Sequence, residues 1–311
     1  MHDAMLRVRP MAVLVITACV CIAPAAARAQ EFTPWSPPTS LGPVVNSSAL
    51  DGCPAISRDG LSLYFATNRV GGQLDIYVTQ RDSREDPWGT PRSIGAVINE
   101  PGSNEYCPAL SRDGHLLFFA SNRAGGCGGV DIYVSHRQNK RDDFAWDSPQ
   151  NLGCIVNSAS DEFGPNYYET EAGTPVLYFN SNRPGGIGGQ DLYVTEGAED
   201  GAFGIPTPVF ELNSVSNDQQ PAVRRDGLEI IFTSNRAGGL GLTDLWQATR
   251  SATSDPWSTP VNLESPMNST AGDARPALSW EGTELYFGSG RTGGLGSDDL
   301  YVATRTKTSA P

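Results

Sequence analysis

Histidine and positive charge are both scarce in this chain of 311 residues. Three histidines are present, His2, His115 and His136. So few scattered imidazoles argue against a histidine-rich metal site and against a Ser-His-Asp triad. Lys and Arg number 22 against 35 Asp and Glu, which gives a formal net charge of −13. Nucleic-acid binding is therefore not expected, because affinity for a phosphate backbone comes largely from cationic side chains.

Motifs for cofactors and metals are also missing. The glycine-rich loops lack the Lys-Ser/Thr ending of a phosphate-binding loop, and each leads into a strand pattern instead of a helix. None carries the alternating aspartates of a calcium loop, and the G-x-S-x-G motif is absent. We expect neither a cofactor nor a metal.

Residues 1–29 have the pattern of a signal peptide. Arg7 and Arg9 precede an apolar run at residues 11–26, and Ala27-Arg28-Ala29 fits a small-x-small cleavage site. The run is too short for a retained membrane span. A lipoprotein signal with Cys19 as the lipidated residue is the alternative. In both cases the chain is predicted to be exported, to the periplasm or the cell exterior.

Glycine and proline, in contrast, are abundant, with 34 and 23 residues. Their excess is typical of many short strands and turns. A turn glycine recurs at intervals of 54, 59, 54 and 55 residues, at Gly60, Gly114, Gly173, Gly227 and Gly282. A period of this length indicates a solenoid or a propeller.

Each repeat contains three predicted strands. In residues 107–134, a proline-led apolar run is followed by a turn, a run ending in Phe119, a glycine-rich loop after Arg123, and a last run at residues 131–134. Short runs rich in aromatic and β-branched residues and bounded by turn residues are typical of strands. Their apolar positions are consecutive, as expected for sheets covered on both faces.

A fourth element, an aromatic-x-x-Pro segment, follows the first four repeats but not the fifth. Its fifth copy occurs at residues 35–38, near the predicted start of the mature chain. The N-terminal strand must then complete the last sheet, which closes a ring and leaves few open sheet edges. The sequence predicts an all-β fold, a five-bladed β-propeller of four-stranded antiparallel blades. We expect one monomeric domain over residues 30–311.

The repeat resembles the PD-type, WD-like β-propeller repeat of the TolB-like group. The resemblance is carried by the pattern Ser-Asn-Arg-x-Gly-Gly-x-Gly-x-x-Asp-Ile-Tyr and extends over roughly residues 32–303. It implies a propeller of the bacterial envelope, and it says little about activity because propellers have many unrelated functions. TolB itself resembles a six-bladed ring with an extra domain, so a Tol-type role is not expected from five repeats.

An acidic residue stands three positions before each strand-leading proline, at Asp51, Glu105, Glu162, Asp218 and Asp273. The first strand of each propeller blade lines the central channel, so we expect these acids around one of its mouths. One interpretation is an acidic ring that attracts and binds a cationic ligand. The other is that each acid pairs with the arginine of its own glycine-rich loop, from Arg69 to Arg291.

Four cysteines follow the predicted signal peptide, and export places them in an oxidising compartment. Cys127 and Cys154 have no counterpart in other repeats and fall on the same face of the second blade, which predicts a disulfide between them. Cys53 and Cys107 occupy equivalent positions in neighbouring repeats, and we expect them to bridge across the channel wall.

Two functions are compatible with these features. Near-identical repeats without a distinguished residue cluster favour a non-catalytic module that binds an envelope protein, peptide or glycan, and not an enzyme. The alternative is a propeller glycoside hydrolase or lyase acting through carboxylates at the channel mouth. Aromatic platforms for sugar rings are few, namely Tyr106, Phe163 and the Tyr167-Tyr168 pair.

Overall fold

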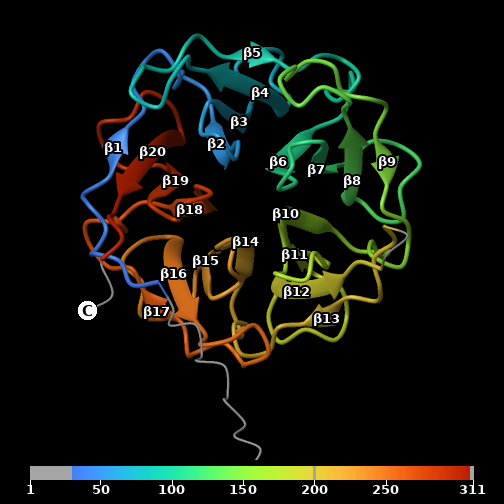
Figure 1. Cartoon of the computed structure of the whole chain (residues 1–311), viewed down its shortest axis with the longest axis vertical. Coiled ribbons are helices and arrows are strands. Elements are labelled where there is room, and N and C mark those ends of the chain that lie inside the picture. The colour runs from blue at the N-terminus through green and yellow to red at the C-terminus, as the bar shows by residue number, and fades with distance from the viewer. Residues whose placement is uncertain (1–29, 199–200, 309–311) are drawn as a thin grey trace, which may run out of the picture.

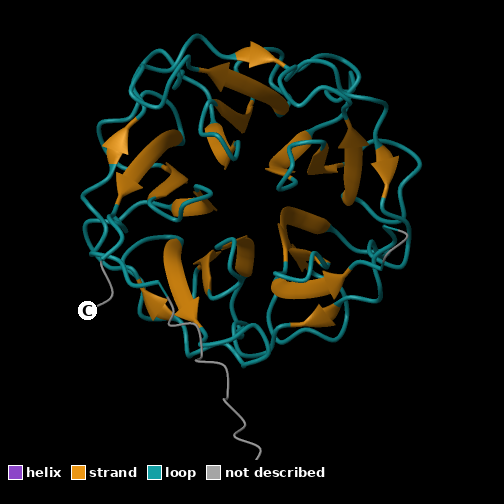
Figure 2. Cartoon of the chain, in the orientation of Figure 1, coloured by secondary structure: helices purple, strands orange, loops and turns teal. Residues whose placement is uncertain are grey.

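The computed structural model describes residues 30–198 and 201–308, and every regular element in this part of the chain is a β-strand. Twenty strands form five four-stranded antiparallel sheets, arranged as blades around a central axis (Figures 1 and 2). The described ranges contain no helix that could cross a membrane. The predicted signal peptide and the lipidation alternative at Cys19 lie outside the described residues.

The first four blades take their strands in chain order from the channel outward. Blade 1 consists of β2 (Asp51–Ile56), β3 (Ser62–Thr67), β4 (Asp75–Gln80) and β5 (Arg92–Ser93). Blade 2 consists of β6 (Glu105–Leu110), β7 (Leu116–Ser121), β8 (Asp131–His136) and β9 (Gln150–Asn151). Blade 3 consists of β10 (Glu162–Glu169), β11 (Pro175–Ser181), β12 (Asp191–Glu196) and β13 (Thr207–Pro208). Blade 4 consists of β14 (Asp218–Val223), β15 (Glu229–Ser234), β16 (Asp244–Thr249) and β17 (Val261–Asn262).

Blade 5 is closed by the two ends of the chain. It consists of β18 (Asp273–Leu278), β19 (Glu284–Ser289), β20 (Asp299–Thr304) and, at its outer edge, β1 (Thr39–Ser40). Thr39 pairs with Val302 and Ser40 with Tyr301 in antiparallel register. The five-bladed propeller closed by the N-terminal strand is therefore confirmed.

The hydrophobic core lies between the blades. Tyr64 and Ile76 of blade 1 pack in one buried cluster with Leu117, Phe119 and Tyr133 of blade 2, and four similar clusters fill the other blade interfaces. Each such side chain contributes about 1.5–3 kcal/mol on burial. Because every sheet is covered on both faces, its strands are apolar at consecutive positions.

An asparagine, buried in four of the five blades, fixes the third strand of every blade. In blade 1, Asn99 accepts a hydrogen bond from the Ile76 amide at 2.8 Å and donates one to the Ile76 carbonyl at 2.9 Å. Asn46, Asn157, Asn213 and Asn268 make the same pair of bonds to their own third strands. The asparagine that follows each aromatic-x-x-Pro segment is thus a structural brace.

The fourth strands are shorter than the aromatic-x-x-Pro pattern suggests. Regular pairing in blade 1 covers only Arg92 and Ser93, directly after Pro91. Proline has no amide hydrogen to donate to a ladder. The segment before it instead makes single contacts, such as the Gly89 amide to the Gln80 carbonyl at 2.8 Å.

Candidate functional site: the central channel

The five predicted acids begin the innermost strands, and all five are buried with 0% exposure. Each accepts a hydrogen bond from the Nη2 of its own blade's loop arginine, over distances of 2.5 to 3.0 Å. The pairs are Asp51–Arg69, Glu105–Arg123, Glu162–Arg183, Asp218–Arg236 and Asp273–Arg291. These pairs tie the start of each inner strand to the glycine-rich loop of the same blade.

Each of these arginines also lies against two aromatic rings of its own blade. The guanidinium of Arg69 lies 5.1 Å from the ring centre of Phe65 and 5.4 Å from that of Tyr77. The other four blades repeat these two contacts at 4.9 to 5.3 Å. The recurring Phe, Arg and Tyr or Trp of the repeat therefore form one unit around each buried acid.

Glu105 is the exception among the acids. In the other four blades a serine four residues earlier donates its amide and hydroxyl to the carboxylate, as Ser158 does to Glu162. In blade 2 that position is Pro101, which has neither donor. The Oε2 atom of Glu105 consequently has no partner in the described structure. Burial raises the pKa of Glu105 to about 7.

A ring of five residues forms the waist of the channel. Each directly precedes the proline of an inner strand and has a positive φ between 44° and 59°: Cys53, Cys107, Gly164, Gln220 and Arg275. The strand register shifts at this point in all five blades, so these residues leave the ladder. For the non-glycine members this conformation costs on the order of 1–2 kcal/mol each.

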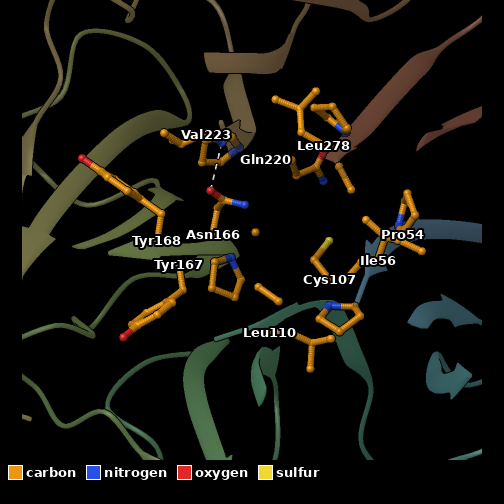
Figure 3. Close-up of a pocket in the computed structure, with 18 of the residues that line it drawn as sticks. Pro54, Ile56, Cys107, Leu110, Asn166, Tyr167, Tyr168, Gln220, Val223 and Leu278 are labelled. Atoms are coloured by element: carbon orange, nitrogen blue, oxygen red, sulfur yellow. Dashed lines mark hydrogen bonds between the residues drawn. The ribbon is translucent and has the colours of Figure 1, made fainter. Parts of the chain in front are cut away.

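A hollow opens at the end of the channel where the inner strands finish. It is lined by inner-strand prolines and aliphatic side chains and, at its rim, by a set we call the arginine mouth: Arg58, Arg112, Asn166, Glu169, Arg225 and Trp280. In Figure 3 Asn166 lies beside the open centre of the channel and its side chain accepts a hydrogen bond from the Val223 amide at 2.9 Å. Arg112, Arg225 and Arg58 are exposed.

Tyr167 and Tyr168 do not serve as platforms in the channel. Both rings point away from its centre in Figure 3. Tyr167 stacks on Phe118 of blade 2 at 5.0 Å, and Tyr168 is buried in the core between blades 3 and 4. The Tyr167 hydroxyl donates to Glu169 at 3.1 Å, and burial is the main cause of the raised pKa of Tyr167.

The opposite end of the channel, where the inner strands begin, is a second and mainly apolar hollow. It is lined by Leu50, Leu74, Tyr106 and Phe163, together with four of the waist residues. The Tyr106 and Phe163 rings meet edge to face with centres 5.4 Å apart. None of the described residues that line this hollow is acidic, because the five acids at this end turn inward to their arginines.

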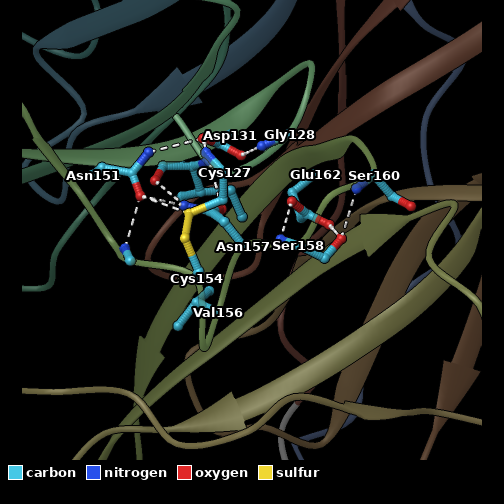
Figure 4. Close-up of a disulfide and its surroundings, with 12 residues drawn as sticks. Cys127, Gly128, Asp131, Asn151, Cys154, Val156, Asn157, Ser158, Ser160 and Glu162 are labelled. Atoms are coloured by element: carbon cyan, nitrogen blue, oxygen red, sulfur yellow. Dashed lines mark hydrogen bonds between the residues drawn. A yellow bond between two sulfur atoms is a disulfide. The ribbon is translucent and has the colours of Figure 1, made fainter. Parts of the chain in front are cut away.

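Both predicted disulfides are present. Cys127 of the blade 2 glycine-rich loop bonds to Cys154 after β9, with the Cα atoms 5.6 Å apart (Figure 4). Cys53 and Cys107 join the inner strands of blades 1 and 2 at the waist. Two disulfides indicate an exported protein folded in an oxidising environment. The described residues contain no group of His, Cys, Asp and Glu side chains that could hold a metal ion.

The arginine mouth was not found by sequence reasoning. Arg58, Arg112 and Arg225 occupy the same place in their repeats, the turn position before Asp-Gly, and Trp280 takes that place in blade 5. The recurrence of arginine at this turn position could have revealed the site, because a turn of this kind does not require arginine. The turn glycines alone were enough to explain the repeat, so the arginines were not singled out.

Comparison with known proteins shows similarity of structure only. No protein-family model and no curated protein sequence matches the chain. The catalytic domain of a GH62 α-L-arabinofuranosidase from Coprinopsis cinerea matches 89% of this chain and 98% of its own length, with 12% identity and a TM-score of 0.60. An endo-arabinase from Bacteroides thetaiotaomicron matches 88% of this chain and 98% of its own, with 17% identity and a TM-score of 0.59. At these identities the likeness establishes the propeller fold.

The comparison corrects two predictions. The interpretation as a non-catalytic binding module, and the expectation that the chain is not an enzyme, are contradicted, because the two solved propellers named above, which match it over 98% of their own length, are glycoside hydrolases. The TolB-like label is not specifically confirmed. TolB from Acinetobacter baumannii gives a TM-score of 0.47 at 14% identity, over 81% of this chain and 53% of its own.

Proposed function

We propose that this propeller is a glycan-cleaving enzyme whose substrate occupies the arginine mouth. The observation that carries the proposal is the composition of that hollow, which combines an indole ring, a carboxylate and a side-chain amide on the axis of a rigid ring. Ligand sites are concave and lined mainly by apolar groups with a few converging polar ones. The glycoside hydrolase fold of the matched structures supports the same class of substrate.

Glu169 is the candidate proton-transferring group. Its side chain is 22% exposed, it accepts the Tyr167 hydroxyl, and its carboxylate lies 4.0 Å from Arg112. Among the described residues that line the arginine mouth, it is the one carboxylate. The five acids of the other end are buried and paired, so they do not reach a substrate in this mouth.

We infer that the enzyme works outside the cytoplasm, in the periplasm or the extracellular medium. Its two disulfides persist only where the surroundings are oxidising.

The test is a screen of the protein spanning residues 30–311 against neutral and acidic polysaccharides, arabinan and arabinoxylan included. New reducing ends are measured for cleavage of any kind, and ultraviolet absorbance of an unsaturated product identifies elimination. Glu169→Gln is expected to lower the rate by about 100-fold or more, because it removes a general acid or base.

Glu171→Gln is the matched control, since Glu171 is exposed two residues further on and does not line the hollow. It should leave the rate unchanged. The proposal fails if no polysaccharide is cleaved, or if Glu169→Gln cleaves as fast as the unmodified protein while both retain the same melting temperature.

A further inference from the structure

Three arginines gather around one indole ring at the arginine mouth. The guanidinium carbons of Arg58, Arg112 and Arg225 lie 4.6, 5.3 and 5.2 Å from the ring centre of Trp280. They come from blades 1, 2 and 4, and Trp280 comes from blade 5. The closure of the ring therefore brings together side chains that are up to 222 residues apart, from position 58 to position 280.

This positive charge is barely compensated. Within the described chain, Arg58 and Arg225 form no ion pair, and Arg112 has only Glu169 at 4.0 Å. The five arginines of the glycine-rich loops differ sharply, since each is paired to a buried acid at 2.5 to 3.0 Å.

The acidic side chains closest in sequence are already engaged elsewhere. Asp59 accepts the Ser57 hydroxyl at 2.6 Å, and Asp113 accepts the Ser111 hydroxyl at 2.6 Å. Asp226 pairs with Arg224 at 2.8 Å, and Glu281 pairs with Lys307 at 2.6 Å. The hydrogen bond from Lys307 is the main cause of the lowered pKa of Glu281, and the charge of Arg225 contributes to it without forming an ion pair. A cluster of three guanidinium groups is thus maintained on a protein whose net charge is −13.

Like charges gathered around one ring repel one another, and an anion bound to them relieves the repulsion. Guanidinium groups suit a carboxylate in particular, because two parallel N–H groups can bond its two oxygens. The three guanidinium groups lie over the Trp280 ring, and the indole that holds them is partly exposed at the mouth. An acidic sugar of the proposed glycan substrate supplies the carboxylate that such a cluster binds.

We propose that the arginine mouth binds a glycan whose sugars carry carboxylates, a uronate polymer, with the carboxylates on the three arginines. The inference rests on the proposed function and names its substrate class. Neutral glycans lack the group that the three arginines recognise.

The experiment is calorimetric titration with an oligogalacturonate and with its methyl ester of the same length. In the ester a methyl group on each carboxyl removes its charge, and the sugar chain is otherwise the same. We expect the acid to bind, the ester to bind at least about tenfold more weakly, and the affinity for the acid to fall as salt concentration rises. Arg58→Gln and Arg225→Gln should each raise the Kd for the acid about tenfold.

Arg141→Gln is the matched control, because Arg141 is exposed and lies outside the mouth. It should leave the Kd unchanged. Equal affinity for acid and ester, or unchanged Kd values in Arg58→Gln and Arg225→Gln, would overturn the inference.

Calorimetry needs no turnover, so this test separates the inference from the proposed function. Binding of the acid without cleavage of any polysaccharide would contradict the proposed enzymatic function and support the uronate-binding site. Cleavage of a neutral glycan together with no binding of the acid would support the proposed enzymatic function and contradict the uronate-binding site.

Discussion

At the scale of single residues, the clearest departure from fivefold symmetry is Pro101. Four blades give the buried acid a serine with two donors, and blade 2 gives it a proline with none. A buried carboxylate oxygen without a hydrogen bond disfavours the charged form, so the pKa of Glu105 rises from 4.5 to about 7 despite Arg123 at 3.0 Å. Glu105 is therefore a buried acid whose pKa lies close to neutral pH.

The raised pKa of Glu105 makes the free energy of unfolding depend on pH in a definite direction. The folded chain holds the Glu105 proton more tightly than the unfolded chain, so the free energy of unfolding falls as pH rises from about 4.5 to about 7. Relative to Glu105→Gln, the unmodified protein should lose about 3 kcal/mol across this window. Urea denaturation at several pH values measures the difference.

Pro101→Ser provides the companion variant. A serine restores donors near the carboxylate and should reduce the pH dependence. Parallel stability profiles for the unmodified protein and Glu105→Gln would show that Glu105 does not titrate in this range.

At the scale of strands and loops, the glycine-rich loop is the most constrained element. Its closing aspartate folds back to accept loop amides, as Asp191 does from Ile187 at 2.9 Å and from Gly188 at 3.0 Å. A Cβ at Gly186 would lie 1.9 Å from the Asp191 carboxylate, and one at Gly188 would lie 1.9 Å from the Ser216 carbonyl. The Gly-Gly-x-Gly pattern thus leaves room for an aspartate and for the next blade's chain.

In blade 2 the same loop is crosslinked by the Cys127–Cys154 disulfide. The bond closes a loop of 27 residues, and the entropy it removes from the unfolded chain is worth about 3.5 kcal/mol. Replacing both cysteines with serine should lower the free energy of unfolding by about this amount, measured by urea denaturation with Cys53–Cys107 intact.

Mass mapping without reductant checks the connectivity on which that expectation depends. Peptides that contain Cys127 and Cys154 should appear linked in the unmodified protein. Free thiols at these positions, or equal stability of the two proteins, would contradict it.

At the scale of the whole molecule, the two ends of the chain hold the ring shut. The Thr33 amide donates to the Thr306 carbonyl at 2.9 Å, and Phe32 pairs with Lys307. Asn46 braces Leu300, and Val45 is fully buried in the cluster between blades 5 and 1. One short strand therefore completes a blade and protects an edge that would otherwise pair with other chains.

Deletion of residues 30–46 should cost about 5 kcal/mol or more, since it removes several buried side chains and the brace. Oligomers are expected on gel filtration because β20 becomes an open edge. Thermal and urea unfolding give the loss of stability.

A circular permutant is the matched control. It joins residue 308 to residue 31 through a short turn and begins at Asp86, in an exposed loop of blade 1. It keeps every strand and should retain the stability of the unmodified protein. A deletion variant as stable and as monomeric as the permutant would show that closure by β1 is dispensable.

The sequence by itself determined the five blades, their strands and the closing role of the N-terminal segment. Most of these features follow from local sequence patterns, namely turn glycines, prolines at strand edges and short apolar runs. The ring closure follows from one fourth-strand segment that stands at the other end of the chain. The cysteine pairs followed as well, because Cys127 and Cys154 break a symmetry that every other repeat keeps.

Only the tertiary structure decided which side chains meet at the channel. Whether an acid such as Glu162 faces solvent or Arg183 depends on how a loop folds over it. The direction of Tyr167 depends on which face of β10 lies against blade 2. Arg58, Arg225 and Trp280 read as ordinary turn residues in sequence, and they become one site because ring closure places distant turns side by side.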